Sequence, residues 1–271
     1  MLSRTLAMAA ALIAALTCQA AAQQKIMIDG STGTAPLIEA LGKAFSTKTN
    51  IAVEIGKGLG TKERFAALTE RKIDIAMASH GLNVAEITAQ GMAVYRIAMT
   101  PVVFGVHETV KADNLTDAQI CSIFAGNVKN WKEVSAADLA IAPMARPESE
   151  VDAQVARDGV GCLKGFKLPE TVKINAGARD MAKALAETPG SVGVTSATVV
   201  EQSGGKVKSL ALNSIAPSEA NVAAGKYRLT RDAFLVLGNQ PSSQSKAFID
   251  FVKSPEGAAI IKANGAIAAA L

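Results

Sequence analysis

A cluster of hydroxyl side chains stands directly before a predicted helix near the N-terminus. Residues 28–45 read IDGSTGTAPLIEALGKAF and bring Ser31, Thr32 and Thr34 together between glycines. One Ser or Thr is enough to cap a helix, because its oxygen accepts a hydrogen bond from an unpaired N–H group of the first turn. Three hydroxyls at a helix start, where the helix dipole also attracts negative charge, form a donor set suited to an oxyanion. A helix cap is the more common use of such residues, so this segment alone leaves both interpretations open.

The elements around this cluster alternate between short apolar runs and helical patterns. Strands are predicted at 25–29, 50–56 and 72–79, and the segments between them carry apolar residues at helical spacing. This β–α–β–α–β order indicates a mainly parallel sheet with helices on both faces. The sequence therefore predicts an α/β fold.

Two long extended runs, at 97–107 and 227–238, enclose a central block of the chain. Within this block, strands are predicted at 139–144, 172–175 and 191–196, again alternating with helical segments. A chain that crosses into a second domain and then returns produces this pattern. We therefore expect two lobes joined by two strands, with a ligand-binding cleft between them.

The N-terminus has the features of a signal peptide. Arg4 supplies the positive charge, and residues 6–16 form an apolar run that is too short to span a bilayer. Three alanines ending at Ala22 fit the cleavage rule for small residues. The residue before Cys18 is not small, which argues against a lipoprotein. We expect residues 1–22 to be cleaved near Ala22 and the mature protein to be exported to a bacterial periplasm.

Composition excludes several classes of function. A net charge of only +4, without a run of Lys and Arg, and an aromatic content of 4% argue against a nucleic-acid partner. The two histidines, His80 and His107, and the absence of Cys-x-x-Cys or His-x-x-x-His spacing argue against a metal or other cofactor. GSTGT is not the Gly-x-Ser-x-Gly elbow of a hydrolase, and GKGLGT lacks the Lys-Ser/Thr ending of a P-loop. We therefore expect a protein that is not an enzyme.

Signal cleavage would leave two cysteines, Cys121 and Cys162. An even number of cysteines in an oxidising compartment is compatible with a disulfide. Two buried free thiols are the alternative, because a disulfide needs Cα atoms within about 4.4–6.8 Å of each other. The sequence does not decide between the two.

Four segments of this chain resemble the phosphate-binding-protein-like branch of the periplasmic solute-binding proteins, the ligand-capturing subunits of bacterial ABC importers. The Leu-Thr…Ile-Phe-Ala-Gly…Asn-Trp pattern of NLTDAQICSIFAGNVKNWKEV, residues 114–134, is the most specific match. The other segments are residues 28–45, residues 56–82 (GKGLGTKERFAALTERKIDIAMASHGL) and residues 248–265 (FIDFVKSPEGAAIIKANG). The resemblance implies a type II periplasmic binding protein fold. We expect one lobe to comprise 23–102 and 228–271, and the other 103–227.

The resemblance also implies a set of ligand-binding residues. Phosphate-binding members of the family hold the oxyanion with hydroxyls, backbone N–H groups and one arginine. In the first lobe the matching residues are Ser31, Thr32, Thr34, Gly58, Gly60 and Ser79, and we expect His80, the residue after Ser79, to contact the ligand as well. In the second lobe they are Arg146 and Ser149.

Two departures from the family pattern bear on the ligand. His80 stands where phosphate binders often carry an acid, and Ser149 is followed by Glu150 and Val151 instead of Gly and Thr. The acids Glu148, Glu150 and Asp152 crowd this loop and would repel an anion unless they turn away. One of them could instead replace the missing acceptor of the family.

We therefore expect a monomeric, non-catalytic periplasmic receptor without a cofactor. It would close its lobes around a small oxyanion, phosphate by preference, and present it to an ABC permease in the inner membrane. One alternative keeps the fold but gives it another small ligand or a sensory role beside a membrane kinase. A second alternative is a secreted hydrolase that uses the cleft.

Overall fold

The computed structural model describes residues 25–79, 81–134 and 138–269. The expected signal peptide and His80 lie outside the described residues. The strands are β1 (Lys25–Gly30), β2 (Ala52–Ile55), β3 (Ile75–Ser79), β4 (Ala93–His107), β5 (Asn114–Leu115), β6 (Ala142–Ala145), β7 (Lys173–Ile174), β8 (Ser191–Ser196), β9 (Val207–Ser209), β10 (Ala211–Leu212), β11 (Thr230–Leu237) and β12 (Ile267–Ala268). The helices are α2 (Ala35–Thr49), α3 (Thr61–Thr69), α4 (Val84–Ala89), α5 (Asp117–Phe124), α6 (Val151–Gly159), α7 (Ala178–Glu187), α8 (Ala197–Gln202), α9 (Glu219–Ala223), α10 (Ser243–Lys253) and α11 (Pro255–Ala263).

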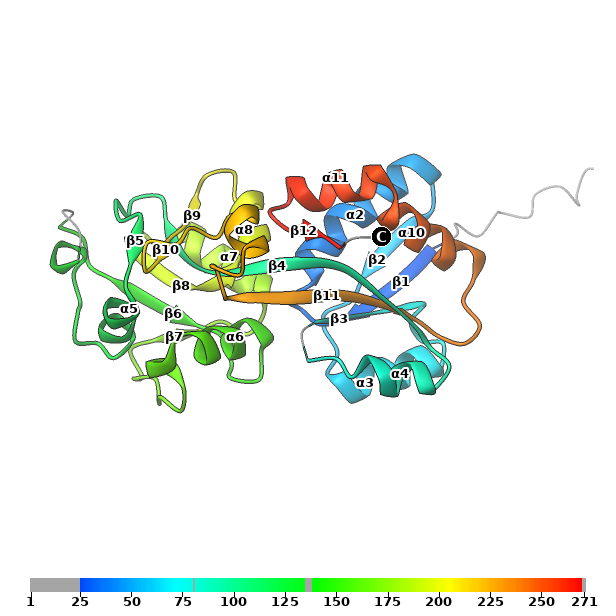
Figure 1. Cartoon of the computed structure of the whole chain (residues 1–271), viewed down its shortest axis with the longest axis horizontal. Coiled ribbons are helices and arrows are strands. Elements are labelled where there is room, and N and C mark those ends of the chain that lie inside the picture. Colours follow the sequence, from blue (N-terminus) through cyan, green and yellow to red (C-terminus); the bar gives the residue numbers. More distant parts are fainter. Residues whose placement is uncertain (1–24, 80, 135–137, 270–271) are drawn as a thin grey trace, which may run out of the picture.

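Two lobes lie side by side, and strands β4 and β11 run between them (Figure 1). The main sheet has the strand order β2-β1-β3-β11-β4-β8-β6-β7, with β12 and β9 also pairing with β4. Strands β1, β2 and β3 pair in parallel in one lobe, as do β6, β7 and β8 in the other. Among the described residues, each antiparallel pair includes β4 or β11. The two-lobed α/β fold with parallel strands in each lobe and two connecting strands is thus confirmed.

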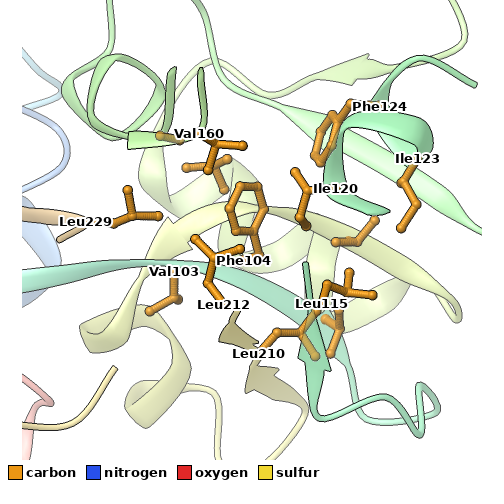
Figure 2. Packing of buried hydrophobic residues seen from close by; sticks show 14 of the residues in the cluster. Val103, Phe104, Leu115, Ile120, Ile123, Phe124, Val160, Leu210, Leu212 and Leu229 are labelled. Carbon is orange, nitrogen blue, oxygen red and sulfur yellow. The ribbon is translucent and has the colours of Figure 1, made fainter. Parts of the chain in front are cut away.

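Each lobe has its own hydrophobic core. The first lobe packs the apolar face of α2 against β1 and α10, and Phe45 meets Phe248 edge-on with ring centroids 5.3 Å apart. In the second lobe, Phe104 of β4 packs in one cluster with Ile120 of α5, Leu115 of β5 and Leu212 of β10 (Figure 2). Trp131 is fully buried there and donates a hydrogen bond from Nε1 to the carbonyl of Gly190, 2.9 Å away. Separate cores allow each lobe to move as a unit. The exact bounds of the lobes stay a prediction.

Strand β4 links the two cores because its apolar residues continue through both lobes. Residues 93–101 pair with β11, and residues 102–106 pair with β8. The burial pattern of β4 changes from half-buried at its start to fully buried along its second half. One continuous strand therefore belongs to both lobes and joins them.

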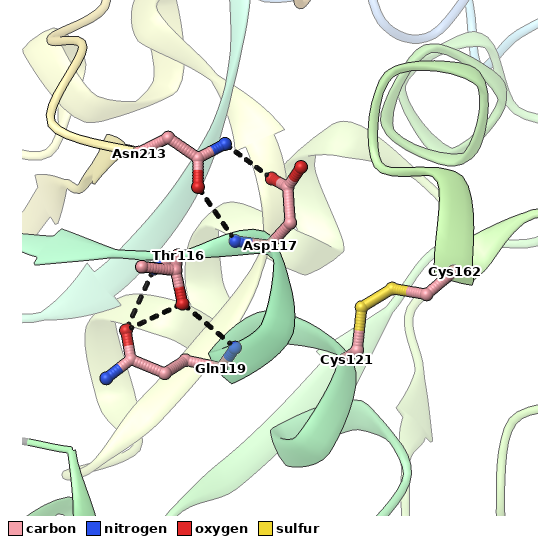
Figure 3. The surroundings of a disulfide bond; sticks show 6 residues. All are labelled: Thr116, Asp117, Gln119, Cys121, Cys162 and Asn213. Carbon is pink, nitrogen blue, oxygen red and sulfur yellow. Dashed lines mark hydrogen bonds between the residues drawn. A yellow bond between two sulfur atoms is a disulfide. The ribbon is translucent and has the colours of Figure 1, made fainter.

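Helix α5 begins with the capping box that the sequence predicts. Gln119 N donates to Thr116 Oγ1 at 3.2 Å, and Thr116 N donates to Gln119 Oε1 at 2.9 Å (Figure 3). On the same helix, Cys121 forms a disulfide with Cys162, and their Cα atoms are 6.1 Å apart. The bond ties α5 to the short helical turn at Gly161–Leu163. The structure therefore pairs the two cysteines, with a Cα separation inside the range that a disulfide requires.

Helices α10 and α11 pack on the first lobe. Ser254 caps α11 by accepting a hydrogen bond from Gly257 N at 3.2 Å, and Pro255 occupies the first helical position. This start agrees with the Ser-Pro signal in the sequence. None of the helices in the described parts of the chain has the length and hydropathy needed to cross a membrane.

Candidate functional site

Residues 31–34 connect β1 to α2, and we call them the hydroxyl loop. The side chains of this loop do not serve as helix caps. Thr34 is the N-cap residue of α2, yet within the described chain its side chain makes no capping hydrogen bond. Its Oγ1 instead donates to the carbonyl of Ala78 at 3.4 Å. Thr32 Oγ1 donates to a carboxylate oxygen of Glu150, 2.9 Å away in the other lobe. The hydroxyl of Thr32 is therefore directed toward the other lobe.

Arg146 follows β6 and reaches the same point from the second lobe. Its guanidinium is 1% exposed, and Nη2 donates to Thr32 Oγ1 at 3.1 Å and to the carboxylate of Glu150. Its Nη1 donates to Asp152 at 3.3 Å. We call Thr32, Arg146, Glu150, Asp152 and Arg231 the interlobe cluster. It places a hydroxyl donor and a cation from different lobes within hydrogen-bond distance of each other.

Arg231 lies on β11 and completes the interlobe cluster from the connecting strand. Its Nε donates to Asp152 at 2.5 Å, and its Nη2 donates to the carbonyl of Gly33 at 2.5 Å. The carboxylate of Asp152 is 3% exposed and is held between two guanidinium groups. The two arginines and two acids balance in charge, which is the condition for burying ionised groups.

A further arginine, Arg64 in the first turn of α3, lies near the interlobe cluster. Its guanidinium donates to the carbonyl of Met77 at 3.2 Å and to Thr61 Oγ1 at 3.2 Å. Burial lowers the pKa of Arg64 from its ordinary value, while the negative charges of Glu63, Glu150 and Asp29 oppose this shift. An arginine nevertheless stays protonated in a protein. Arg64 therefore adds a positive charge close to Glu150.

The glycine loop after β2 packs directly against the hydroxyl loop. Gly58 has a φ of +118°, and a Cβ atom there would lie 2.5 Å from Cγ2 of Thr32. Its N–H donates to Asp29 Oδ1 at 3.0 Å. Gly60 precedes α3, and its carbonyl accepts a hydrogen bond from Arg64 N at 3.0 Å. Glycine at position 58 thus lets the two loops approach, because any side chain would displace Thr32.

The structure brings together only part of the residue set expected from the sequence. Thr32, Gly58 and Arg146 meet at the interlobe cluster, and Gly60 lies beside Arg64. The other hydroxyl residues of the first lobe make bonds outside the interlobe cluster. These are Thr34 (to Ala78), Ser79 (to Asp232, 3.1 Å) and Ser31, which is half-buried and donates its backbone N–H to Met77.

Ser149 is exposed, and the structure does not place its side chain at the cluster. The physical reason is the start of α6, which begins at Val151 with Glu150 as its N-cap residue. Glu150, at the N-cap, is the residue of this loop whose side chain bonds to Thr32. Of the other two acids, Glu148 turns to the surface and pairs with Arg157, whereas Asp152 is buried between arginines.

Arg231 had no place in the residue set expected from the sequence. Its signal is an arginine at the start of the apolar run 233–237 in the same strand, where a charged side chain that becomes buried has to find a partner. Among the residues that the structure describes, no His, Cys, Asp and Glu side chains are grouped as ligands for a metal ion. The chemistry available at the site is the binding of an oxyanion by a hydroxyl and guanidinium groups.

The sequence matches one protein family and is similar to phosphate-binding proteins of bacteria. The sequence profile of the family described as PBP superfamily domain matches residues 17–256. The phosphate-binding protein PstS of Borreliella burgdorferi is 25% identical over 260 residues, covering 92% of this chain and 91% of that protein. PstS of Bacillus subtilis is 24% identical over 243 residues, covering 87% and 77%.

A solved structure shows the same fold with a ligand present. An ABC transporter substrate-binding protein from Clostridium perfringens, with bound phosphate, is 26% identical to this chain. The two superpose with a TM-score of 0.72, over 91% of this chain and 100% of the other. An ABC-type phosphate transport receptor from Vibrio cholerae superposes with a TM-score of 0.60 at 25% identity, over 89% and 99%.

Proposed function

The chain belongs to the PBP superfamily, and from this premise we propose that it is a periplasmic receptor for inorganic phosphate. In this proposal the mature protein is an exported monomer without catalytic activity. It closes its lobes around the anion and delivers it to an ABC permease in the inner membrane. The phosphate-binding relatives and the phosphate-bound structure of similar fold support this assignment.

One observation carries the proposal. Thr32 and Arg146 come from different lobes, and both donate hydrogen bonds to the same oxygen, Oε2 of Glu150. The lobes thus meet around a negatively charged oxygen. A phosphate oxygen needs the same kind of donors, since an arginine and a hydroxyl together form charge-assisted hydrogen bonds to oxyanions.

The fold supplies a way to open and close this site. Strands β4 and β11 connect the lobes, so a small number of residues can absorb the hinge motion. Two further contacts join the lobes. Arg179 of α7 pairs with Glu39 of α2, and Gln202 Nε2 donates to the carbonyl of Pro36 at 2.9 Å. A ligand that binds both lobes would favour this closed state.

Replacing Thr32 by Val tests the proposal, because valine keeps the shape of threonine and removes its hydroxyl. A hydrogen bond to a charged group contributes about 1.5–3 kcal/mol. We expect phosphate affinity to fall about tenfold, the lower end of that range, because the same hydroxyl also holds Glu150. Titration calorimetry of the mature protein with phosphate, sulfate and molybdate measures the change.

The matched control is Thr47→Val on the exposed face of α2, where the hydroxyl donates to the carbonyl of Lys43 at 2.9 Å. We expect this variant to bind phosphate like the wild type. Equal affinity of the Thr32→Val protein and the wild type would argue against a ligand at the interlobe cluster. Binding of none of the three anions by the wild type would overturn the proposed function itself.

A further inference from the structure

We propose that Glu150 is an internal competitor of the ligand. Its carboxylate occupies the anion position of the interlobe cluster and has to leave before phosphate binds there. This inference rests on the proposed function, and it assigns to Glu150 the role of setting the affinity of the site. The residue does not contact phosphate as a ligand in this scheme.

The hydrogen bonds of Glu150 show that the competition is direct. Its Oε2 accepts from Thr32 Oγ1 at 2.9 Å and from Nη2 of Arg146. A threonine hydroxyl has a single proton to donate, so it cannot hold the carboxylate and a phosphate oxygen together. Two anions within hydrogen-bond distance of one hydroxyl would also repel each other. Only one of the two therefore occupies the position at a time.

The charges of the cluster lead to the same conclusion. With Glu150 in place, Arg146 and Arg231 are balanced by Glu150 and Asp152, so the interlobe cluster itself carries no net charge. When Glu150 leaves, the cluster has one net positive charge, and Arg64 nearby adds another. Departure of Glu150 therefore creates the electrostatic attraction that phosphate needs.

Glu150 can leave the cluster more easily than the other acid. Its side chain is 24% exposed, compared with 3% for Asp152. It stands at the N-cap of α6, and in the described structure its side chain makes no hydrogen bond that caps the helix. Turning outward thus breaks the bonds to Thr32 and Arg146 but leaves α6 intact. Asp152, in contrast, is fixed between two buried guanidinium groups.

An internal competitor lowers the apparent affinity by the fraction of molecules in which the site is free. If Glu150 occupies the site in about nine molecules of ten, the apparent dissociation constant rises about tenfold. The receptor would then respond to a higher phosphate concentration than a relative without this acid. The bonds of Glu150 across the cleft would also hold the empty lobes together.

The test compares Glu150→Gln and Glu150→Ala with Glu148→Gln in phosphate calorimetry. Glutamine removes the charge at nearly constant size, and alanine removes the competing group altogether. Glu148 is in the same loop and pairs with Arg157 at the surface, so its substitution controls for the loss of one negative charge. We expect both Glu150 variants to bind phosphate at least about tenfold more tightly than the wild type, and Glu148→Gln to match the wild type.

Equal or weaker binding by both Glu150 variants would overturn the inference while leaving the proposed function in place, since Glu150 would then support the ligand or not affect it. Failure of every protein to bind phosphate would refute the proposed function. The inference would then fail as well, because Glu150 would have no ligand with which to compete. Circular dichroism confirms that each variant is folded.

Discussion

Arg146→Ala is expected to weaken phosphate binding about a hundredfold or more. The substitution removes a charged hydrogen-bond donor, which contributes up to about 3 kcal/mol, or roughly a hundredfold in affinity. It also leaves Glu150 and Asp152 facing Arg231 as the remaining arginine of the cluster, so that the net charge there becomes negative. Both effects weaken the binding of an anion. Calorimetry with phosphate measures the loss.

Two further variants separate the role of Arg146 from general effects of charge. Arg228→Ala removes an exposed arginine that lies just before β11 and should bind phosphate like the wild type. Arg146→Lys keeps the charge but loses the planar fork of donors, so we expect an affinity between those of the wild type and Arg146→Ala. An Arg146→Ala protein with an affinity within about threefold of the wild type would place the ligand elsewhere.

Asp152→Asn is expected to cause the largest loss of stability in the cluster. The carboxylate lies between Arg146 and Arg231, with N–O distances of 3.3 and 2.5 Å, and is almost fully buried. Removing one partner from a buried ionic group costs about 3–5 kcal/mol, because the remaining charges are left without compensation. For a protein of this size, that loss corresponds to a fall in Tm of about 6–20 °C.

Thermal and urea unfolding of the wild type, Asp152→Asn and Asp158→Asn provide the measurement. Asp158 is an exposed acid of the same helix, so its substitution should change the free energy of unfolding by no more than about 0.5 kcal/mol. If the unfolding curves of the two variants coincide, the buried ionic cluster does not hold the lobes as described here.

Most of the fold could be predicted because its elements are long and periodic. Residues 191–196 were expected as a strand and form β8 with the same bounds. Strand β4 begins at Ala93, four residues earlier than expected, because its first residues are half-buried and lack a continuous apolar pattern. The short strands β5, β9, β10 and β12, of two or three residues, are too brief to show any periodicity.

The site could be predicted less well, because its bonding partners are distant in sequence. Gly33 and Arg231 bond across a separation of 198 residues, which no local pattern reveals. Ser149 and Glu150 are neighbours in the same loop, yet Ser149 is exposed and Glu150 bonds to Thr32, a difference that the spacing of the loop does not show. The family resemblance did indicate Thr32 and Arg146. In the structure, Nη2 of Arg146 lies 3.1 Å from Oγ1 of Thr32.

A crystal structure of the mature protein grown with saturating phosphate tests the central claim most directly. We predict a phosphate between the lobes, with oxygens about 2.7–3.2 Å from Thr32 Oγ1 and Arg146 Nη2 and with the carboxylate of Glu150 turned outward. A structure in which phosphate is bound elsewhere, while Glu150 still bridges Thr32 and Arg146, would contradict it.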